Sequence, residues 1–524
     1  MPDSSRAVPT GSSTFIRLAI ALGVVAASCA QPNVDPSVES TPAAVTAAAT
    51  SASPGNLDVL FMIDNSSSMK LKQQKLASQI PGFVTALQNL PMGLPNLHIA
   101  VVSSDMGAPG DSTSSIMCTK TGDNGQFRFG ATSGVSVAQQ PGLDGGAPGA
   151  DDAGAPGCAG ASLNSGATFI SNVDGVANYT GDLSTLLSCM TALGDTGCGF
   201  ENQLASISRA LGADGLPAPS SNAGFLRPDA QLAIIVLSDE DDCSAPANTA
   251  LYSLNGGQQN IANPLRPIAN YRCNQFGHLC VDPAASGSTC LTEPPLKPPT
   301  DAQSTATGPT LDLTNCESDD SNGLVTSVRS FVNGIKALKA DPDNQIVVGA
   351  IVAPPTPYTV AWLPAAGGQN TTPGELWPVV EHSCGAAGGD DVNPAATVTT
   401  SDGSFGDPAV RIAQWAQAFG ANGVTAAICD SNYASAFNAI ASRIGAHLPG
   451  GSASVTSSGA GGTGATGSAL PICPNGITSP GVSNGLSDGG CGCGVDPVHA
   501  SPWTLALFGT LLALARRRRR ADRR

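Results

Sequence analysis

Residues 57–69 read LDVLFMIDNSSSM, an apolar run that stops at Asp64 and is followed by Ser66 and Ser68. An apolar run of this length next to turn-forming residues is typical of a strand buried on both faces, as in the centre of a parallel sheet. Ligands of open α/β sheets bind at the carboxyl ends of such strands. The carboxylate and two hydroxyls can turn their oxygens toward one point, which favours Mg²⁺ or Mn²⁺ over zinc.

A second stretch repeats this order. Residues 232–237 read LAIIVL and are followed by Ser238 and Asp239, so another buried strand ends at an aspartate. We expect Asp239 to lie near Asp64, because the carboxyl ends of parallel strands meet at one edge of a sheet. The alternative is an acidic, solvated turn, and we assign Glu240, Asp241 and Asp242 to such a turn.

Asp-x-Ser-x-Ser after one strand, with an aspartate after a later one, resembles the metal-ion-dependent adhesion site of von Willebrand factor A domains. The resemblance covers roughly residues 56–448. It implies that Ser66 and Ser68 bind Mg²⁺ or Mn²⁺ directly, and that Asp64, Asp239 and Thr196 bind it directly or through water. Thr196 is assigned by resemblance alone, from the loop before the helical stretch 201–211, and its alternative role is to cap that helix. A partner protein's acidic side chain would complete the coordination.

Strand and helix patterns alternate through the chain and predict an α/β fold, a doubly wound, mostly parallel, Rossmann-like sheet over residues 56–450. We expect further strands at 96–104, 345–352 and 424–429, and helices at 70–90, 183–193, 201–211, 324–338, 409–419 and 433–447. Within the first of these strands, His98 is interpreted as structural. Three long insertions are expected near 105–180, 243–322 and 353–407. The first is rich in Gly and Asp, and calcium binding there is a weaker alternative because EF-hand spacing is absent.

The chain has 15 cysteines, which in a secreted protein favour disulfides. Sequence cannot fix their connectivity, and we expect the pairs Cys189–Cys198 and Cys384–Cys429. A zinc site is the weaker alternative, because the one close group of cysteine and histidine lacks CxxC spacing. That group consists of Cys273, His278, Cys280 and Cys290.

Both ends of the chain carry targeting patterns. Residues 1–30 read as a secretory signal, with Cys29 either lipidated or next to an ordinary cleavage site. Residues 31–55 and 451–490 are spacers of Pro, Ala, Ser, Thr and Gly. Residues 491–524 combine a Cys motif, an apolar segment and an Arg cluster, and resemble the C-terminal sorting tail of many myxobacterial surface proteins. They are either processed near Cys491 or Cys493 or kept as a membrane helix. We therefore expect a secreted protein, anchored at the bacterial surface or outer membrane by its lipid or its tail.

Composition and missing motifs exclude several classes of function. The net charge is -16, and seven of the 24 basic residues lie within 516–524, which argues against a nucleic-acid partner. We find no GxSxG nucleophile elbow between a predicted strand and helix, no P-loop and no HExxH motif, and Ser66 stands where a phosphohydrolase would carry its second Asp. We expect an adhesion or protein-binding module, not an enzyme. The alternatives are a structural envelope protein with a non-binding domain and, less favoured, a Mg²⁺-dependent hydrolase.

Overall fold

The computed structural model describes residues 55–108, 118–129, 160–247, 249–252, 270–283, 290–298, 303–305, 308–364, 376–385 and 404–451. These residues belong to one compact unit that begins at Ser53. Within these ranges, every helix is too short or too polar to cross a bilayer. The predicted signal, most of the first spacer, the second spacer beyond residue 451 and the sorting tail lie outside the described residues.

The centre of the fold is a seven-stranded sheet in the order β15-β12-β7-β1-β2-β4-β5. Its first five strands run parallel. The parallel strands are β1 (Asn56–Ile63), β2 (Asn96–Ser103), β7 (Gln231–Leu237), β12 (Ile346–Val352) and β15 (Gly423–Ala427). From β1 the chain first adds β2 on one side and later β7 on the other, so β1 and β7 flank the switch point of the sheet.

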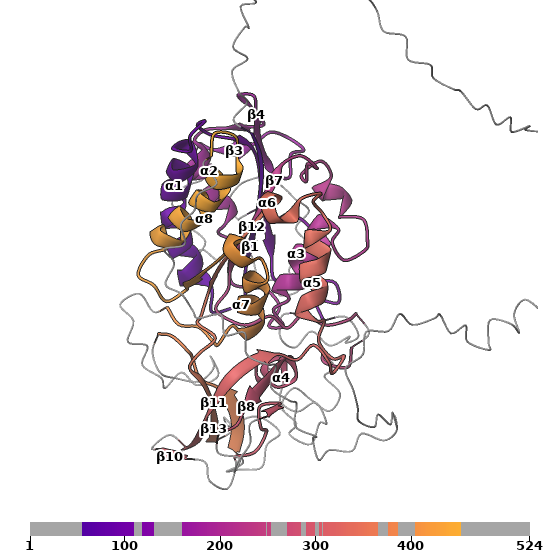
Figure 1. Ribbon diagram of the computed structural model, residues 1–524, viewed down its shortest axis with the longest axis vertical. Coiled ribbons are helices and arrows are strands. Elements are labelled where there is room, and N and C mark those ends of the chain that lie inside the picture. Colours follow the sequence, from indigo (N-terminus) through magenta and orange to yellow (C-terminus); the bar gives the residue numbers. More distant parts are fainter. Residues whose placement is uncertain are drawn as a thin grey trace, which may run out of the picture. The chain divides into compact units, whose positions relative to one another are not determined.

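Helices cover both faces of this sheet, because successive strand residues point to opposite faces. Phe61 belongs to the core beneath α1 (Lys70–Gln88), α2 (Leu183–Met190) and α8 (Ala434–His447). Its neighbour Met62 belongs to the opposite core, beneath α3 (Gln203–Leu211), α5 (Val328–Lys336) and α7 (Val410–Gln417). Figure 1 shows α1, α2 and α8 on one side of the central strands, and α3 and α5 on the other. The predicted α/β class with a mostly parallel sheet is confirmed, as are strands at 96–104, 232–237, 345–352 and 424–429 to within a residue or two.

The first predicted insertion contributes more to the fold than its sequence indicates. Its last part forms β3 (Ser162–Leu163), β4 (Ile170–Val173), β5 (Val176–Ala177) and β6 (Tyr179–Thr180). Strand β4 pairs antiparallel with β2 and so extends the main sheet. Phe127 and Ile170, both within the predicted insertion, are fully buried, so this part of the insertion belongs to the core.

The second and third insertions together build a second, antiparallel sheet in the order β14-β13-β11-β8-β9, with β10 paired to β11. Its strands are β8 (His278–Val281), β9 (Leu291–Thr292), β10 (Gln303–Thr305), β11 (Gly308–Ser318), β13 (Tyr358–Pro364) and β14 (Leu376–Val380). Helix α4 (Asn270–Gly277) leads into β8. The short elements η2 (Ser220–Asn222), α6 (Pro342–Gln345) and η3 (Gly420–Asn422) join strands and helices of the main sheet.

Four disulfides join described cysteines. The predicted pair Cys384–Cys429 is confirmed. The predicted pair Cys189–Cys198 is wrong, because Cys198 is bonded to Cys118 across 80 residues, a separation that local spacing does not reveal. The other two pairs are Cys243–Cys273 and Cys280–Cys316. Cys290 is also disulfide-bonded, so all three cysteines of the weaker zinc alternative are used in disulfides.

Candidate functional site

Asp64 lies at the carboxyl end of β1 and is fully buried. Its Oδ1 accepts hydrogen bonds from the Ser66 amide at 2.9 Å and from Ser104 Oγ at 3.0 Å. Its Oδ2 accepts one from Ser238 Oγ at 2.6 Å. Burial, together with the nearby carboxylate of Asp239, raises the pKa of Asp64 to about 6. Asp64 therefore fixes the loop that follows β1 and joins it to the ends of β2 and β7.

The two predicted serine ligands lie together. Ser66 is buried and Ser68 is half-buried, and their Oγ atoms are 3.5 Å apart. A tight turn, in which the Met69 amide donates to the Ser66 carbonyl at 3.1 Å, brings these hydroxyls together just before α1 begins at Lys70. Two neighbouring hydroxyls at this place are suited to share one hard cation.

Asp239 follows β7, which pairs directly with β1, so the structure brings the two predicted aspartates to one edge of the sheet. Its side chain is buried, and its Oδ1 has no hydrogen-bond partner. A buried carboxylate oxygen is rarely left unpaired, and this one is available to bind a ligand. Its Oδ2 forms an ion pair with Lys72 of α1.

Lys72 is a site residue that the sequence analysis missed. Its ammonium also donates to the Ser68 carbonyl at 3.1 Å and lies 3.5 Å from the centre of the Phe405 ring. Its spacing could have revealed this role, because a residue four positions beyond Ser68 in a helix lies over the loop that contains Ser68. The role was missed because, in the sequence, Lys72 resembles an ordinary polar residue in the first turn of an amphipathic helix.

Thr196 lies in a loop that contacts the loop after β1. Its loop is fastened to the Asp64 loop, since the Gly197 amide donates to the Asn65 carbonyl at 2.7 Å. Gln73 Nε2 adds hydrogen bonds to the carbonyls of Asp64 and Gly194, at 2.7 and 2.8 Å. The Thr196 side chain itself is exposed. The alternative role as a cap is wrong, because the N-cap of α3 is Asn202.

A pair of buried carboxyl groups, Glu201 and Glu240, lies next to the two aspartates and was also missed as part of the site. Their side chains are hydrogen-bonded to each other, and burial raises the pKa of Glu201 to about 8. Burial likewise raises the pKa of Glu240, and the nearby charge of Glu201 adds to this effect. A proton shared between the two groups limits the negative charge that the site must hold.

The prediction of a solvated acidic turn after Asp239 is wrong, because Asp241 and Asp242 are buried. Asp241 Oδ2 lies 2.7 Å from His278 Nε2, and its oxygens accept the Arg411 and Ile412 amides at 2.7 and 3.1 Å, so it caps α7. The turn is buried because each carboxylate has partners that sequence neighbours do not supply.

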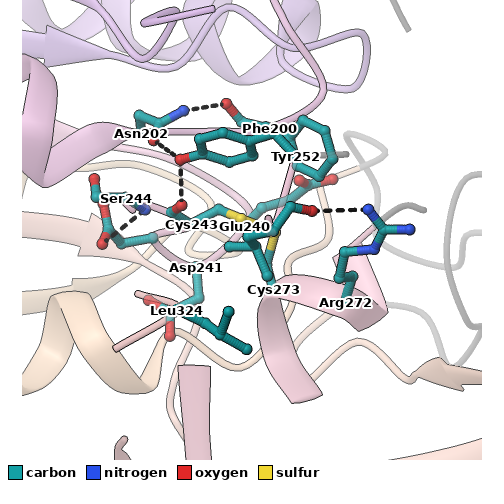
Figure 2. The surroundings of a disulfide bond; sticks show 12 residues. Phe200, Asn202, Glu240, Asp241, Cys243, Ser244, Tyr252, Arg272, Cys273 and Leu324 are labelled. Atoms are coloured by element: carbon teal, nitrogen blue, oxygen red, sulfur yellow. Dashed lines mark hydrogen bonds between the residues drawn. A yellow bond between two sulfur atoms is a disulfide. The ribbon is translucent and has the colours of Figure 1, made fainter. Parts of the chain in front are cut away.

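Asp242 caps α3 through the Leu204 amide at 2.9 Å and pairs with Arg411 at 3.0 Å. Figure 2 shows the Cys243–Cys273 disulfide directly after this run, with the Tyr252 hydroxyl donating to the Cys243 carbonyl. Asp241 and Asp242, the last two residues of the acidic run, therefore have structural roles.

His98 and His382 have structural partners. His98 lies 2.8 Å from the Phe225 carbonyl and 3.6 Å from Asp58, which supports its structural interpretation. His382 stacks on Phe405 at 4.3 Å and lies 2.7 Å from Asp407. The Asp407 amide donates to the Asp239 carbonyl at 2.7 Å, so the 404–407 segment lies against the site.

The described residues supply oxygen atoms that could bind a metal ion, but they do not form a cluster of typical metal-ligating side chains. Among them, no group of three or more His, Cys, Asp or Glu side chains is arranged to hold a metal ion. The fit to Mg²⁺ or Mn²⁺ rests instead on the two adjacent hydroxyls and the unpaired Oδ1 of Asp239. Neither a scan against protein-family models nor a search of the curated proteins found a match for this chain.

Proposed function

We propose that the chain carries a von Willebrand factor A-type domain that binds a divalent cation and, through it, an acidic side chain of a partner protein. One observation carries the proposal. The hydroxyls of Ser66 and Ser68 lie next to each other at the end of β1, and the buried Oδ1 of Asp239, at the end of the adjacent β7, lacks a partner. This is the switch point of the sheet, where open α/β folds bind ligands.

Each residue has a distinct role in this proposal. Ser66, Ser68 and Asp239 would hold Mg²⁺ or Mn²⁺, and Thr196 would approach from its fastened loop. Asp64 would act mainly by orienting the Ser66 backbone and the Ser238 hydroxyl, since both its oxygens already accept hydrogen bonds. The bound cation supplies positive charge that a partner's carboxylate can ligate.

We further propose display at the bacterial surface, by the N-terminal lipid or the C-terminal tail. Four disulfides among the described cysteines support an oxidising compartment. A binding role is preferred to hydrolysis, because Ser66 occupies the place of the second aspartate of a phosphohydrolase pair.

A specific observation favours one competing function, a structural envelope protein whose site takes no metal. Lys72 already supplies a positive charge to Asp239. In that case Lys72 would neutralise the buried acidic residues at this edge of the sheet, and the protein would bind its partners through its exposed surface.

A cation titration followed by thermal unfolding separates the two functions. We expect millimolar Mg²⁺ or Mn²⁺ to raise the melting temperature of the wild type, because a ligand that binds only the folded state stabilises it. Asp64→Asn and Asp64→Ala should lose this rise. Asp343→Ala, at an exposed aspartate in α6, should keep it. No rise in the wild type would refute the metal-dependent function and leave the structural one.

A further inference from the structure

The Lys72 ammonium lies in a closed cage. The residue is 1% exposed and contacts three groups: the Asp239 carboxylate, the Ser68 carbonyl and the face of the Phe405 ring. An ammonium removed from water needs a carboxylate and hydrogen-bond acceptors around it, and an aromatic face adds cation–π attraction. The cage supplies all three kinds of contact.

The cage lies where the proposed cation would bind. Lys72 takes Oδ2 of Asp239, and the other oxygen of the same carboxylate is the unpaired atom of the site. Its second acceptor is the carbonyl of Ser68, whose hydroxyl is a proposed ligand. A divalent cation bound to these groups would lie within a few ångströms of the ammonium. Two positive charges so close in a buried site repel strongly.

The segment over the cage is fastened on two sides. Phe405 stacks on His382, and the Gly406 amide donates to the Cys384 carbonyl at 3.2 Å. Cys384 is in turn bonded to Cys429 beyond the end of β15. The ring is therefore held over Lys72, and the ammonium cannot leave Asp239 unless its side chain swings out from beneath Phe405.

We propose that Lys72 is the resident cation of this site, and that a divalent cation enters only by displacing its ammonium from Asp239. The inference rests on the proposed function and adds a residue that sets the metal affinity. It follows that the metal-free site is charge-compensated and stable, and that the metal binds more weakly than its oxygen ligands alone would allow.

The test is a Mn²⁺ titration of the full-length protein, with free Mn²⁺ measured by electron paramagnetic resonance. Lys72→Met keeps the length of the side chain and removes its charge. Lys75→Met is the matched control, since Lys75 belongs to the same helix and donates to the carbonyls of Ile428 and Asp430 at 3.2 and 2.8 Å. We expect Lys72→Met to bind Mn²⁺ at least about ten-fold more tightly than the wild type, and Lys75→Met to match the wild type.

A second readout does not depend on affinity. Without metal, Lys72→Met should melt below the wild type, because Asp239 is left as a buried, unpaired charge, and Mn²⁺ should reverse this loss. Lys72→Gln, which keeps a donor for Asp239, is a milder variant that should also bind Mn²⁺ more tightly than the wild type. Equal Mn²⁺ affinity in all four proteins would overturn the inference and leave the cation site standing. Absence of Mn²⁺ binding from all four would overturn the site itself.

Discussion

Replacing Arg411 by Met should destabilise the protein by about 3–5 kcal/mol, the usual effect of removing one partner of a buried ion pair. The guanidinium is fully buried and pairs with Asp242 through Nε at 3.3 Å and Nη2 at 3.0 Å. It also donates to Ser318 Oγ and to the Thr326 carbonyl, both at 2.7 Å. Methionine fills a similar volume, so the loss arises mainly from the uncompensated charge of Asp242.

Urea unfolding of the oxidised protein, followed by tryptophan fluorescence, measures this loss as a lower midpoint at unchanged slope. The double variant Arg411→Met/Asp242→Asn is the decisive control. The amide oxygen of the introduced asparagine would still accept the Leu204 amide that Asp242 accepts at 2.9 Å, and the buried charge is gone. We expect the double variant to recover part of the stability. A loss below about 1 kcal/mol in Arg411→Met, or no recovery in the double variant, would refute the assignment of a buried ion pair.

Three further predictions concern the surroundings of the site. Because burial raises the pKa of Glu201 from 4.5 to about 8, its contribution to stability is complete below pH 4.5 and is lost as the pH rises through 8. Glu201→Gln should remove this fall in stability with pH, which amounts to at most about 1.4 kcal/mol per pH unit. Urea unfolding at several pH values tests this, and parallel stability–pH curves for the variant and the wild type would contradict it. A Cβ on Gly197 would lie 2.3 Å from Asn65 Oδ1. Gly197→Ala should therefore cost about 1–3 kcal/mol and abolish stabilisation by Mg²⁺, and an unchanged thermal shift would disprove the tight contact. The pair Cys384→Ser/Cys429→Ser opens a link across 45 residues, and a fall of about 4 kcal/mol in unfolding free energy is expected from chain entropy, to be checked by urea titration.

The parts of the fold that sequence predicts are those that depend on local pattern. Strands β1 and β7 are mainly apolar because both of their faces are buried, and the polar residues of the site begin where each strand ends. The meeting of Asp64 and Asp239 follows from parallel pairing of these strands. That Ser66 and Ser68 share one turn follows from their spacing alone.

The parts that sequence misses depend on distant partners. Asp242 looks like one member of a solvated acidic run until Arg411, 169 residues later, is placed beside it. Cys198 has a cysteine nine positions before it, yet it is bonded to Cys118. Strand β11 lies in a segment rich in polar residues, and only its pairing with β8 and β13 makes it a sheet. The periodicity of apolar residues does not predict such contacts, because it indicates which residues are buried and not which residues they contact.

The five residues from Ser238 to Asp242 connect the candidate site to the second insertion. Ser238 contacts Asp64 at the end of β1, and Asp239 contacts Lys72 in α1. The two last carboxylates of the run contact the second sheet and the helices, through His278 and Arg411. Since His278 begins β8, a strand of the second insertion, the insertion holds the segment that presents Asp239. A shift of this segment would move the unpaired oxygen away from the serine hydroxyls. We therefore expect the second insertion to set the geometry of the proposed cation site by holding the segment that contains Asp239.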